Sequence, residues 1–100
     1  MEHRLAALAA IPPGEGRNFE VDGVAVAVFH TRDGAVFATQ ARCPHRQGPL
    51  ADGLTDGAMV ICPLHDRTYD LRTGTSVNSD CSIQVFPARV TAEGTVMLTL

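Results

Sequence analysis

Two short segments of this chain each combine a cysteine with a nearby histidine. The first is C-x-H, formed by Cys43 and His45, and the second is C-x-x-H, formed by Cys62 and His65. Sixteen residues separate the two segments, so each one offers a thiolate and an imidazole of its own. These side chains bind zinc and also the iron of iron–sulfur centres. The spacing therefore indicates one metal site assembled from two loops.

Two kinds of metal centre use a set of two cysteines and two histidines. Such a set holds structural zinc, and it also holds a two-iron cluster when the cysteines bind one iron and the histidines the other. Zinc fingers usually pair like ligands, whereas each segment here mixes the two types. The mixture favours the two-iron cluster, and a zinc-stabilised interaction module stays open as the alternative. Pro44 and Pro63, which follow the two cysteines, argue against four unrelated core residues.

Residues 43–48 (CPHRQG) and 62–70 (CPLHDRTYD) resemble the two cluster-binding segments of the Rieske [2Fe–2S] family. The resemblance runs from about residue 11 to the C-terminus. It is strongest to the small subunit of NAD(P)H-dependent nitrite reductase and to the stand-alone Rieske ferredoxins of bacterial oxygenase systems. It implies an all-β, Rieske-type domain of stacked antiparallel sheets, with a cluster-binding subdomain made of two loops.

The same resemblance implies the cofactor and its ligands. One [2Fe–2S] cluster would be bound, with Cys43 and Cys62 on the inner iron and His45 and His65 on the outer iron near the surface. Neutral imidazoles remove negative charge from the cluster, so Rieske potentials lie at about −150 to +300 mV, against about −400 mV for plant-type ferredoxins. The expected function is one-electron transfer within an oxidoreductase system, with no catalytic residue in this chain.

Two sets of protein redox partners fit that function. The first is the large subunit of a nitrite reductase, which carries flavin, iron–sulfur and sirohaem groups in the family that the sequence resembles. The second is an NADH-dependent reductase together with a terminal oxygenase. Residues 11–16 and 48–53 favour the nitrite reductase type slightly.

Composition excludes several other classes of function. The 100 residues carry a formal net charge of -3, which offers no basic surface for nucleic acid. No apolar run is long enough to span a bilayer, and residues 5–11 (LAALAAI) lack a small-residue cleavage site. The three cysteines imply no disulfide framework. We therefore expect one domain over residues 1–100, located in the cytoplasm, that binds neither nucleic acid nor a membrane.

Turn signals recur about every ten residues, which is typical of a sandwich or barrel. Asp-Gly pairs at 22–23 and 33–34 and Glu-Gly at 93–94 predict hairpins. Residues 1–10 are ambiguous, because alanine and leucine favour a helix but the segment is short. Two turn-rich stretches, about residues 41–56 and 62–70, are expected to be the cluster-binding loops. The expected strands span residues 18–21, 24–31, 35–40, 58–61, 68–71, 82–90 and 95–100.

Three residues near the second loop follow or depart from the family pattern. In high-potential Rieske proteins, an aromatic hydroxyl at the place of Tyr69 donates to a ligand sulfur, and a serine two positions earlier donates to a bridging sulfide. This sequence keeps the tyrosine but has Arg67 in the serine position. Asp66 stands where the family usually has glycine, and aspartate is among the few other residues that tolerate a positive φ.

Other candidate residues have simpler interpretations. Cys81 is left over once the ligands are assigned, so we expect a packed residue with a free thiol. His3 and His30 are expected to be solvated or packed histidines rather than ligands. Two readings stay open for three apolar residues, which either form a collar around the exposed histidines or pack locally within the loops: Pro49, Leu50 and Leu64.

Overall fold

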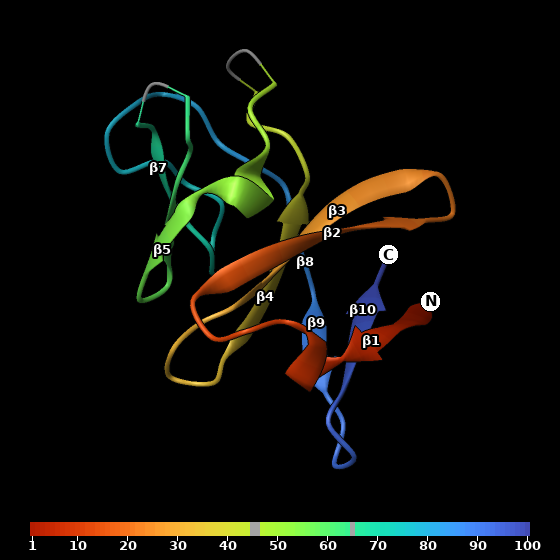
Figure 1. The fold of residues 1–100 in the computed structure, drawn as a ribbon. Helices are drawn as coiled ribbons and strands as arrows, with labels where there is room; N and C mark the ends of the chain where they lie inside the picture. The colour runs from red at the N-terminus through yellow and green to blue at the C-terminus, as the bar shows by residue number, and fades with distance from the viewer. Residues whose placement is uncertain (45–46, 65) are drawn as a thin grey trace.

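The computed structural model describes residues 1–44, 47–64 and 66–100, and it is built almost entirely of antiparallel strands (Figure 1). Three sheets form, with the strand orders β1-β10-β9, β2-β3-β4-β8 and β5-β6-β7. This arrangement confirms the all-β prediction. None of the described residues belongs to a helix with the length and hydrophobicity that a membrane span requires. The elements are β1 (Glu2–Ala7), η1 (Leu8–Ala10), β2 (Glu15–Val21), β3 (Val24–His30), β4 (Val36–Gln40), η2 (Leu50–Asp52), β5 (Leu54–Asp56), β6 (Met59–Ile61), β7 (Thr68–Asp70), β8 (Val85–Phe86), β9 (Ala88–Val90) and β10 (Thr95–Thr99).

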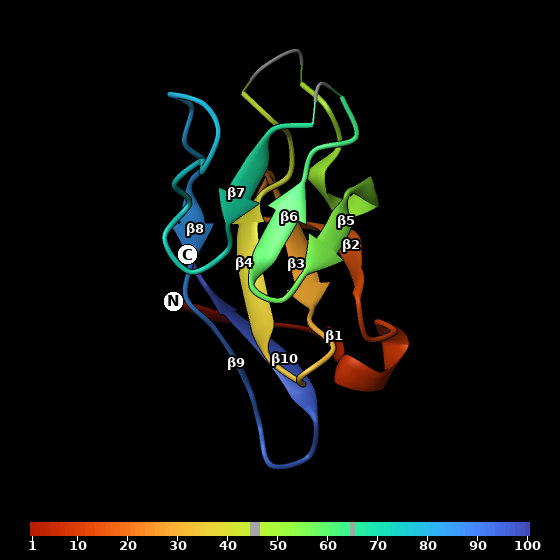
Figure 2. The ribbon, with the colours of Figure 1, turned by 90° about the vertical axis from the view of Figure 1, so that its left-hand side faces the viewer.

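Strand β3 lies at the centre of the hydrophobic core, with both of its faces buried. Successive side chains of a strand point to opposite faces. Ala27 and Phe29 accordingly belong to one buried cluster, whereas Val26 and Val28 belong to another. The first cluster includes residues of β6 and β7, and the second includes residues of β10. Figure 2 shows β5, β6 and β7 in front of the central sheet, with β9 and β10 below it.

The hairpin between β2 and β3 is confirmed, and its turn is tight. Val21 pairs with Val24, and Asp22 and Gly23 have φ values of 51° and 79°, as a type I′ turn requires. Strand β2 begins at Glu15 rather than at residue 18. Glycine and charged residues at its start have weak strand propensity, but pairing with the apolar strand β3 extends it to Glu15.

Residues 2–7 form a strand, which resolves the ambiguity at the N-terminus. Strand β1 pairs with β10 along its length, from Glu2 opposite Thr99 to Ala7 opposite Thr95. Short helices are marginal even for alanine-rich sequences, so the hydrogen bonds offered by β10 outweigh the helical propensity. Within residues 1–10, helical structure is confined to Leu8–Ala10, which form a single 3₁₀ turn.

The prediction of one strand over residues 82–90 is wrong. Val85–Phe86 form β8, which pairs with β4 in the central sheet, whereas Ala88–Val90 form β9, which pairs with β10. Pro87 separates them, because proline lacks the N–H that a continuous ladder needs and fixes φ. The chain therefore passes from one sheet to another at this proline, and the predicted last hairpin is right only for β9 and β10.

Short strands form at the ends of both predicted cluster-binding stretches. The stretch 41–56 ends in η2 and in β5, and the stretch 62–70 ends in β7. The strand expected over residues 68–71 is confirmed as β7. Strand β5 was not expected, because a strand of three residues is too short to show an alternating pattern in the sequence. The described parts of the two loops lie at the same end of the molecule in both views (Figures 1 and 2).

Candidate metal centre

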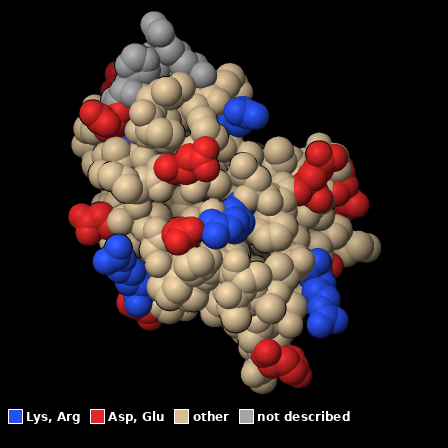
Figure 3. Space-filling model, viewed as in Figure 1, with Lys and Arg blue, Asp and Glu red and all other residues tan. Residues whose placement is uncertain are grey.

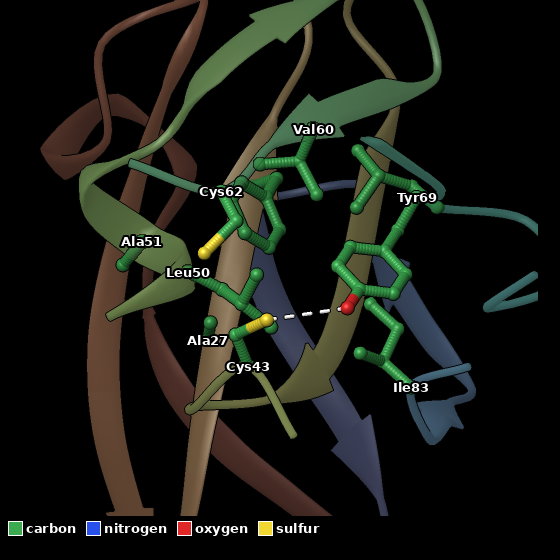
Figure 4. Close-up of a cluster of buried hydrophobic side chains, with 10 residues drawn as sticks. Ala27, Cys43, Leu50, Ala51, Val60, Cys62, Tyr69 and Ile83 are labelled. Carbon is green, nitrogen blue, oxygen red and sulfur yellow. Dashed lines mark hydrogen bonds between the residues drawn. The ribbon is translucent and has the colours of Figure 1, made fainter. Parts of the chain in front are cut away.

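The structure brings two of the four predicted ligands together. Cys43 and Cys62 are both fully buried, and they belong to one hydrophobic cluster with Leu50, Val60 and Tyr69 (Figure 4). The Cys43 thiol is also one of the groups that raise the pKa of the Cys62 thiol. Loops that are far apart in the sequence therefore converge, as the spacing predicted. The other two predicted ligands, His45 and His65, lie outside the described residues.

All three cysteines are free thiols, in agreement with the expectation of no disulfide framework. Within residues 1–44, 47–64 and 66–100, no group of three or more His, Cys, Asp or Glu side chains is placed to hold a metal ion. Of the four predicted ligands, the structure thus describes the two thiols of Cys43 and Cys62, which we call the thiol pair.

Hydrogen bonds within the backbone close the first loop at its base. The N–H of Cys43 donates to the carbonyl of Gly48 over 2.7 Å, and the N–H of Leu50 donates to the carbonyl of Ala41 over 3.0 Å. Gln47 has a positive φ of 58°, which turns the chain back toward the sheet. These contacts fix the Cα position of Cys43 from both sides of the loop.

The second loop is closed in a similar way, with help from a third segment. The N–H of Cys62 donates to the carbonyl of Arg67 over 2.8 Å. Asp66 has a φ of 54°, which confirms that aspartate replaces glycine in a left-handed position. The Asn78 side chain accepts from the N–H of Thr68 and donates to the carbonyl of Asp66, each over 3.0 Å. Sequence reasoning missed Asn78, because an asparagine in a polar stretch carries no signal of a distant partner.

Gly48 is the point at which the two loops touch. A Cβ atom at this position would lie 2.9 Å from the sulfur of Cys62 and 3.2 Å from Cγ of Leu64. Any side chain here would therefore push the second loop away from the first. In the sequence, Gly48 stands out only as part of segment 43–48, which resembles the Rieske family. The lack of space for a side chain at this position becomes visible in the structure.

Of the two readings left open for Pro49, Leu50 and Leu64, local packing applies to Leu50. Leu50 is fully buried and packs in the core beneath the thiols. Its position on η2, which contacts β2 and β3, turns it inward. Leu64 is 41% exposed and lies against Gly48 at the contact between the loops. Pro49 is partly exposed.

Burial is the main influence on the acidity of the Cys62 thiol. It raises the pKa of the Cys62 thiol, the neighbouring Cys43 thiol raises it further, and the backbone of Leu64 and the charge of Arg67 act in the opposite direction. The raised pKa favours the protonated Cys62 thiol in the absence of a metal, and metal binding releases the proton of a ligand thiol. A dry pair of sulfurs at the meeting point of two loops suits a centre that needs two thiolates on one metal.

Tyr69 completes the described site. Its side chain is fully buried, and its hydroxyl lies 3.2 Å from the sulfur of Cys43 (Figure 4). Burial and the Cys43 thiol raise the pKa of Tyr69 above its usual range. The hydroxyl therefore keeps its proton at neutral pH and donates it to the sulfur once Cys43 is a thiolate. This contact confirms the expectation for Tyr69 drawn from the family resemblance.

Comparison with known proteins decides the family. The profile of the Rieske-like [2Fe–2S] domain matches residues 3–99. The chain belongs to this Rieske-like [2Fe–2S] domain family. It is therefore an electron-transfer domain that binds one [2Fe–2S] cluster, and the zinc module has no support among its relatives.

Rieske proteins of two kinds resemble this chain. The ferredoxin subunit of biphenyl dioxygenase from Pseudomonas sp. (strain KKS102) is 39% identical over 84 residues, which cover 80% of this chain and 75% of the relative. A Mycobacterium tuberculosis structure, assigned as the small subunit of an NADH-dependent nitrite reductase, superimposes with a TM-score of 0.90 at 28% identity and covers 98% of this chain and 93% of its own. The ferredoxin of carbazole 1,9a-dioxygenase from Nocardioides aromaticivorans IC177 superimposes with a TM-score of 0.87 at 26% identity, over 99% and 97% of the two chains.

The remaining cysteine and two histidines of interest have structural partners. His30 is buried, and its Nδ1 lies 2.6 Å from the carbonyl oxygen of Ile11. His3 lies 3.5 Å from the carboxylate of Asp22. Cys81 is partly buried and packs against the hydrophobic cluster that contains the thiol pair. These positions confirm the interpretation of the three residues as packed side chains of the Rieske domain.

Replacing Tyr69 by phenylalanine is expected to lower the reduction potential of the Rieske cluster by about 40 mV. Reduction adds negative charge, which the hydroxyl stabilises through the sulfur of Cys43, and a hydrogen bond worth about 1 kcal/mol corresponds to that shift for one electron. Redox titration of the two purified proteins measures the difference. Iron content and melting temperature should stay close to the wild-type values, and an unchanged potential in a fully loaded variant would contradict the assigned hydrogen bond.

Proposed function

We propose that this chain carries one electron at a time between two protein partners, on a [2Fe–2S] cluster held by Cys43, His45, Cys62 and His65. The observation that carries the proposal is the convergence of two buried thiols at the meeting point of two loops in a Rieske domain. The cluster, when bound, supplies a site that accepts and releases a single electron. The two histidines are assigned from the sequence pattern.

The protein side chains around the thiols would do three things for that cluster. Leu50 and Val60 keep water away from the sulfurs, because both are fully buried in the same cluster of side chains. The Tyr69 hydroxyl, 3.2 Å from the sulfur of Cys43, would donate a hydrogen bond to that sulfur once it is a thiolate. Leu64, 41% exposed beside the site, offers an apolar contact to a redox partner. An electron carrier needs such a dry and partly apolar edge, so that a partner can approach closely.

We further propose that residues 1–100 act as one domain, located in the cytoplasm. The support for a single domain is strand β3, because its alternate side chains belong to both hydrophobic clusters and so tie the three sheets together. Acidic and basic side chains are interspersed over the described surface of the face drawn in Figure 3. A mixed surface of this kind, with a net charge of -3, suits a protein partner rather than nucleic acid or a membrane.

The first candidate partner is the large subunit of an NAD(P)H-dependent nitrite reductase. The similarity to the Mycobacterium tuberculosis small subunit supports it, since that match covers nearly the full length of both chains. The electron would then travel within one enzyme, and the present chain would be its small subunit.

The second candidate is a pair of partners, an NADH-dependent reductase and a terminal oxygenase. The 39% identity with a biphenyl dioxygenase ferredoxin subunit favours it. In addition, a chain of the solved complex between oxygenase and ferredoxin in carbazole 1,9a-dioxygenase superimposes with a TM-score of 0.84 at 29% identity. The present chain would then be a diffusing ferredoxin.

Two measurements test these proposals in turn. Anaerobically purified protein should be red-brown, should contain iron and acid-labile sulfide in equal amounts, and should give a rhombic EPR signal of low average g after reduction. Colourless protein with zinc alone would refute the electron-carrier function. Reduced protein should then be reoxidised by a sirohaem nitrite reductase large subunit with nitrite, or by an aromatic-ring oxygenase with its substrate and O₂. The faster acceptor identifies the class of partner.

A further inference from the structure

Arg67 contains a buried polar atom that no described residue satisfies. Its Nε is inaccessible to solvent and has no hydrogen-bond partner among the described residues. Buried polar atoms are almost always paired, and leaving a charged group without a partner costs more than leaving a neutral one. Arg67 takes part in none of the ion pairs found among the described residues, which involve three other arginines and one histidine: Arg17, Arg72, Arg89 and His3.

The position of Arg67 relates this unsatisfied group to the thiol pair. Its carbonyl accepts the N–H of Cys62 over 2.8 Å, so its backbone is fixed at the base of the second loop. The Arg67 side chain therefore starts from a backbone position that is hydrogen-bonded to Cys62, one of the two buried thiols.

We propose that the Arg67 guanidinium is a fixed positive charge beside the [2Fe–2S] cluster that favours its reduced form. The proposal rests on the cluster site put forward above. An added electron places negative charge on the cluster, and a cation at short range in partly desolvated surroundings stabilises that charge. The unsatisfied Nε–H is in addition a donor available to the negatively charged group that the site is built to hold. Arg67 would thus stabilise the reduced cluster through its charge, without coordinating the iron.

Redox titration followed by EPR tests the proposal on purified, cluster-containing proteins. Arg67→Gln and Arg67→Met remove the charge, with side chains of intermediate length, whereas Arg67→Lys keeps it. Arg4→Gln is the matched control, because Arg4 is exposed on β1, in a different sheet, and forms none of the described ion pairs. Iron and acid-labile sulfide, measured on each protein, establish that equal amounts of cluster are compared.

Arg67→Gln and Arg67→Met should each shift the equilibrium toward the oxidised cluster about tenfold, which is 59 mV for one electron. Arg67→Lys should retain most of the wild-type potential, and Arg4→Gln should change the equilibrium by less than about twofold, because exposed charges are screened by solvent. A fully loaded Arg67→Gln or Arg67→Met protein with the wild-type potential would overturn the proposal. So would a Lys variant whose potential falls as far as that of the Gln variant. Absence of a cluster from the wild-type protein would instead refute the proposed function itself, so the two failures are distinguishable.

Discussion

Replacing Cys62 by serine is expected to abolish cluster binding and to lower the melting temperature by roughly 12–24 °C. Binding of a metal centre to a site that forms only on folding contributes directly to folding free energy. For a domain of this size, about 3 kcal/mol of lost stability corresponds to that shift, at about 4–8 °C per kcal/mol. Iron analysis, the visible absorption spectrum and a thermal scan at one fixed heating rate measure the effect. Cys62→Ala should behave in the same way, which excludes the new hydroxyl as the cause.

Cys81→Ser is the matched control for that experiment. It changes the same atom in the third cysteine, which is only partly buried and packs at the edge of the same hydrophobic cluster. It should keep the full complement of iron and should lose no more than about 1 kcal/mol, as is typical of substitutions away from special sites. A Cys62→Ser protein with wild-type iron content would refute the assignment of Cys62 as a ligand. An unchanged melting temperature in an iron-free variant would refute the coupling between cluster and fold.

The hairpins were predictable because their signals are local. Asp22-Gly23 and Glu93-Gly94 each lie between two paired strands, and both turns occur where the sequence predicts them. The division of residues 82–90 between two sheets was not predictable in the same way. Val85 and Phe86 pair with β4, which lies more than forty residues earlier in the chain. Such pairing depends on tertiary contacts that outweigh local propensity.

For the candidate site, the chemistry of the side chains could be predicted from the sequence, whereas the steric requirements around them could not. The thiol pair and the contact of Tyr69 with Cys43 followed from residue types, spacing and family resemblance. The requirement for glycine at position 48 follows from the approach of Cys62, and the connection of Asn78 to the second loop follows from the path of residues 71–82. Both contacts join segments that are distant in the sequence, so no local sequence pattern predicts them. The choice between the two readings of Leu50 could not be made from the sequence for the same reason, since its burial depends on η2.

Residues 70–83 form a tight turn that places Ile83 against the Tyr69 side chain. The carboxylate of Asp70 accepts hydrogen bonds from the backbone N–H and the guanidinium of Arg72, which lower the pKa of that carboxyl. The N–H of Gly74 then donates to the carbonyl of Asp70 over 2.7 Å, and the carbonyl of Gly74 accepts from the N–H of Ile83 over 2.8 Å. Ile83 is itself buried beside Tyr69 in the cluster that holds the thiols (Figure 4).

Gly74→Ala is therefore expected to destabilise the protein by about 3–5 kcal/mol, a size reserved for strain and overpacking at special positions. Gly74 has a φ of 83°, and a Cβ atom there would overlap the carbonyl oxygen of Ile83. Gly94→Ala is the control, because Gly94 has a nearly identical φ of 85° but open space around the added atom. It should cost only about 1–2 kcal/mol, the price of a left-handed backbone with a side chain.

The difference between the two variants isolates the steric clash from the backbone strain, and denaturant unfolding of the cluster-containing proteins measures it. The clash also has a consequence at the metal centre. Displacing Ile83 loosens the packing that holds the Tyr69 hydroxyl against Cys43, so the reduction potential of Gly74→Ala should fall toward that of Tyr69→Phe, whereas Gly94→Ala should keep the wild-type value. Equal losses of stability in the two glycine variants would show that the segment around Ile83 yields to the added methyl group, and that the turn at Gly74 does not support the site.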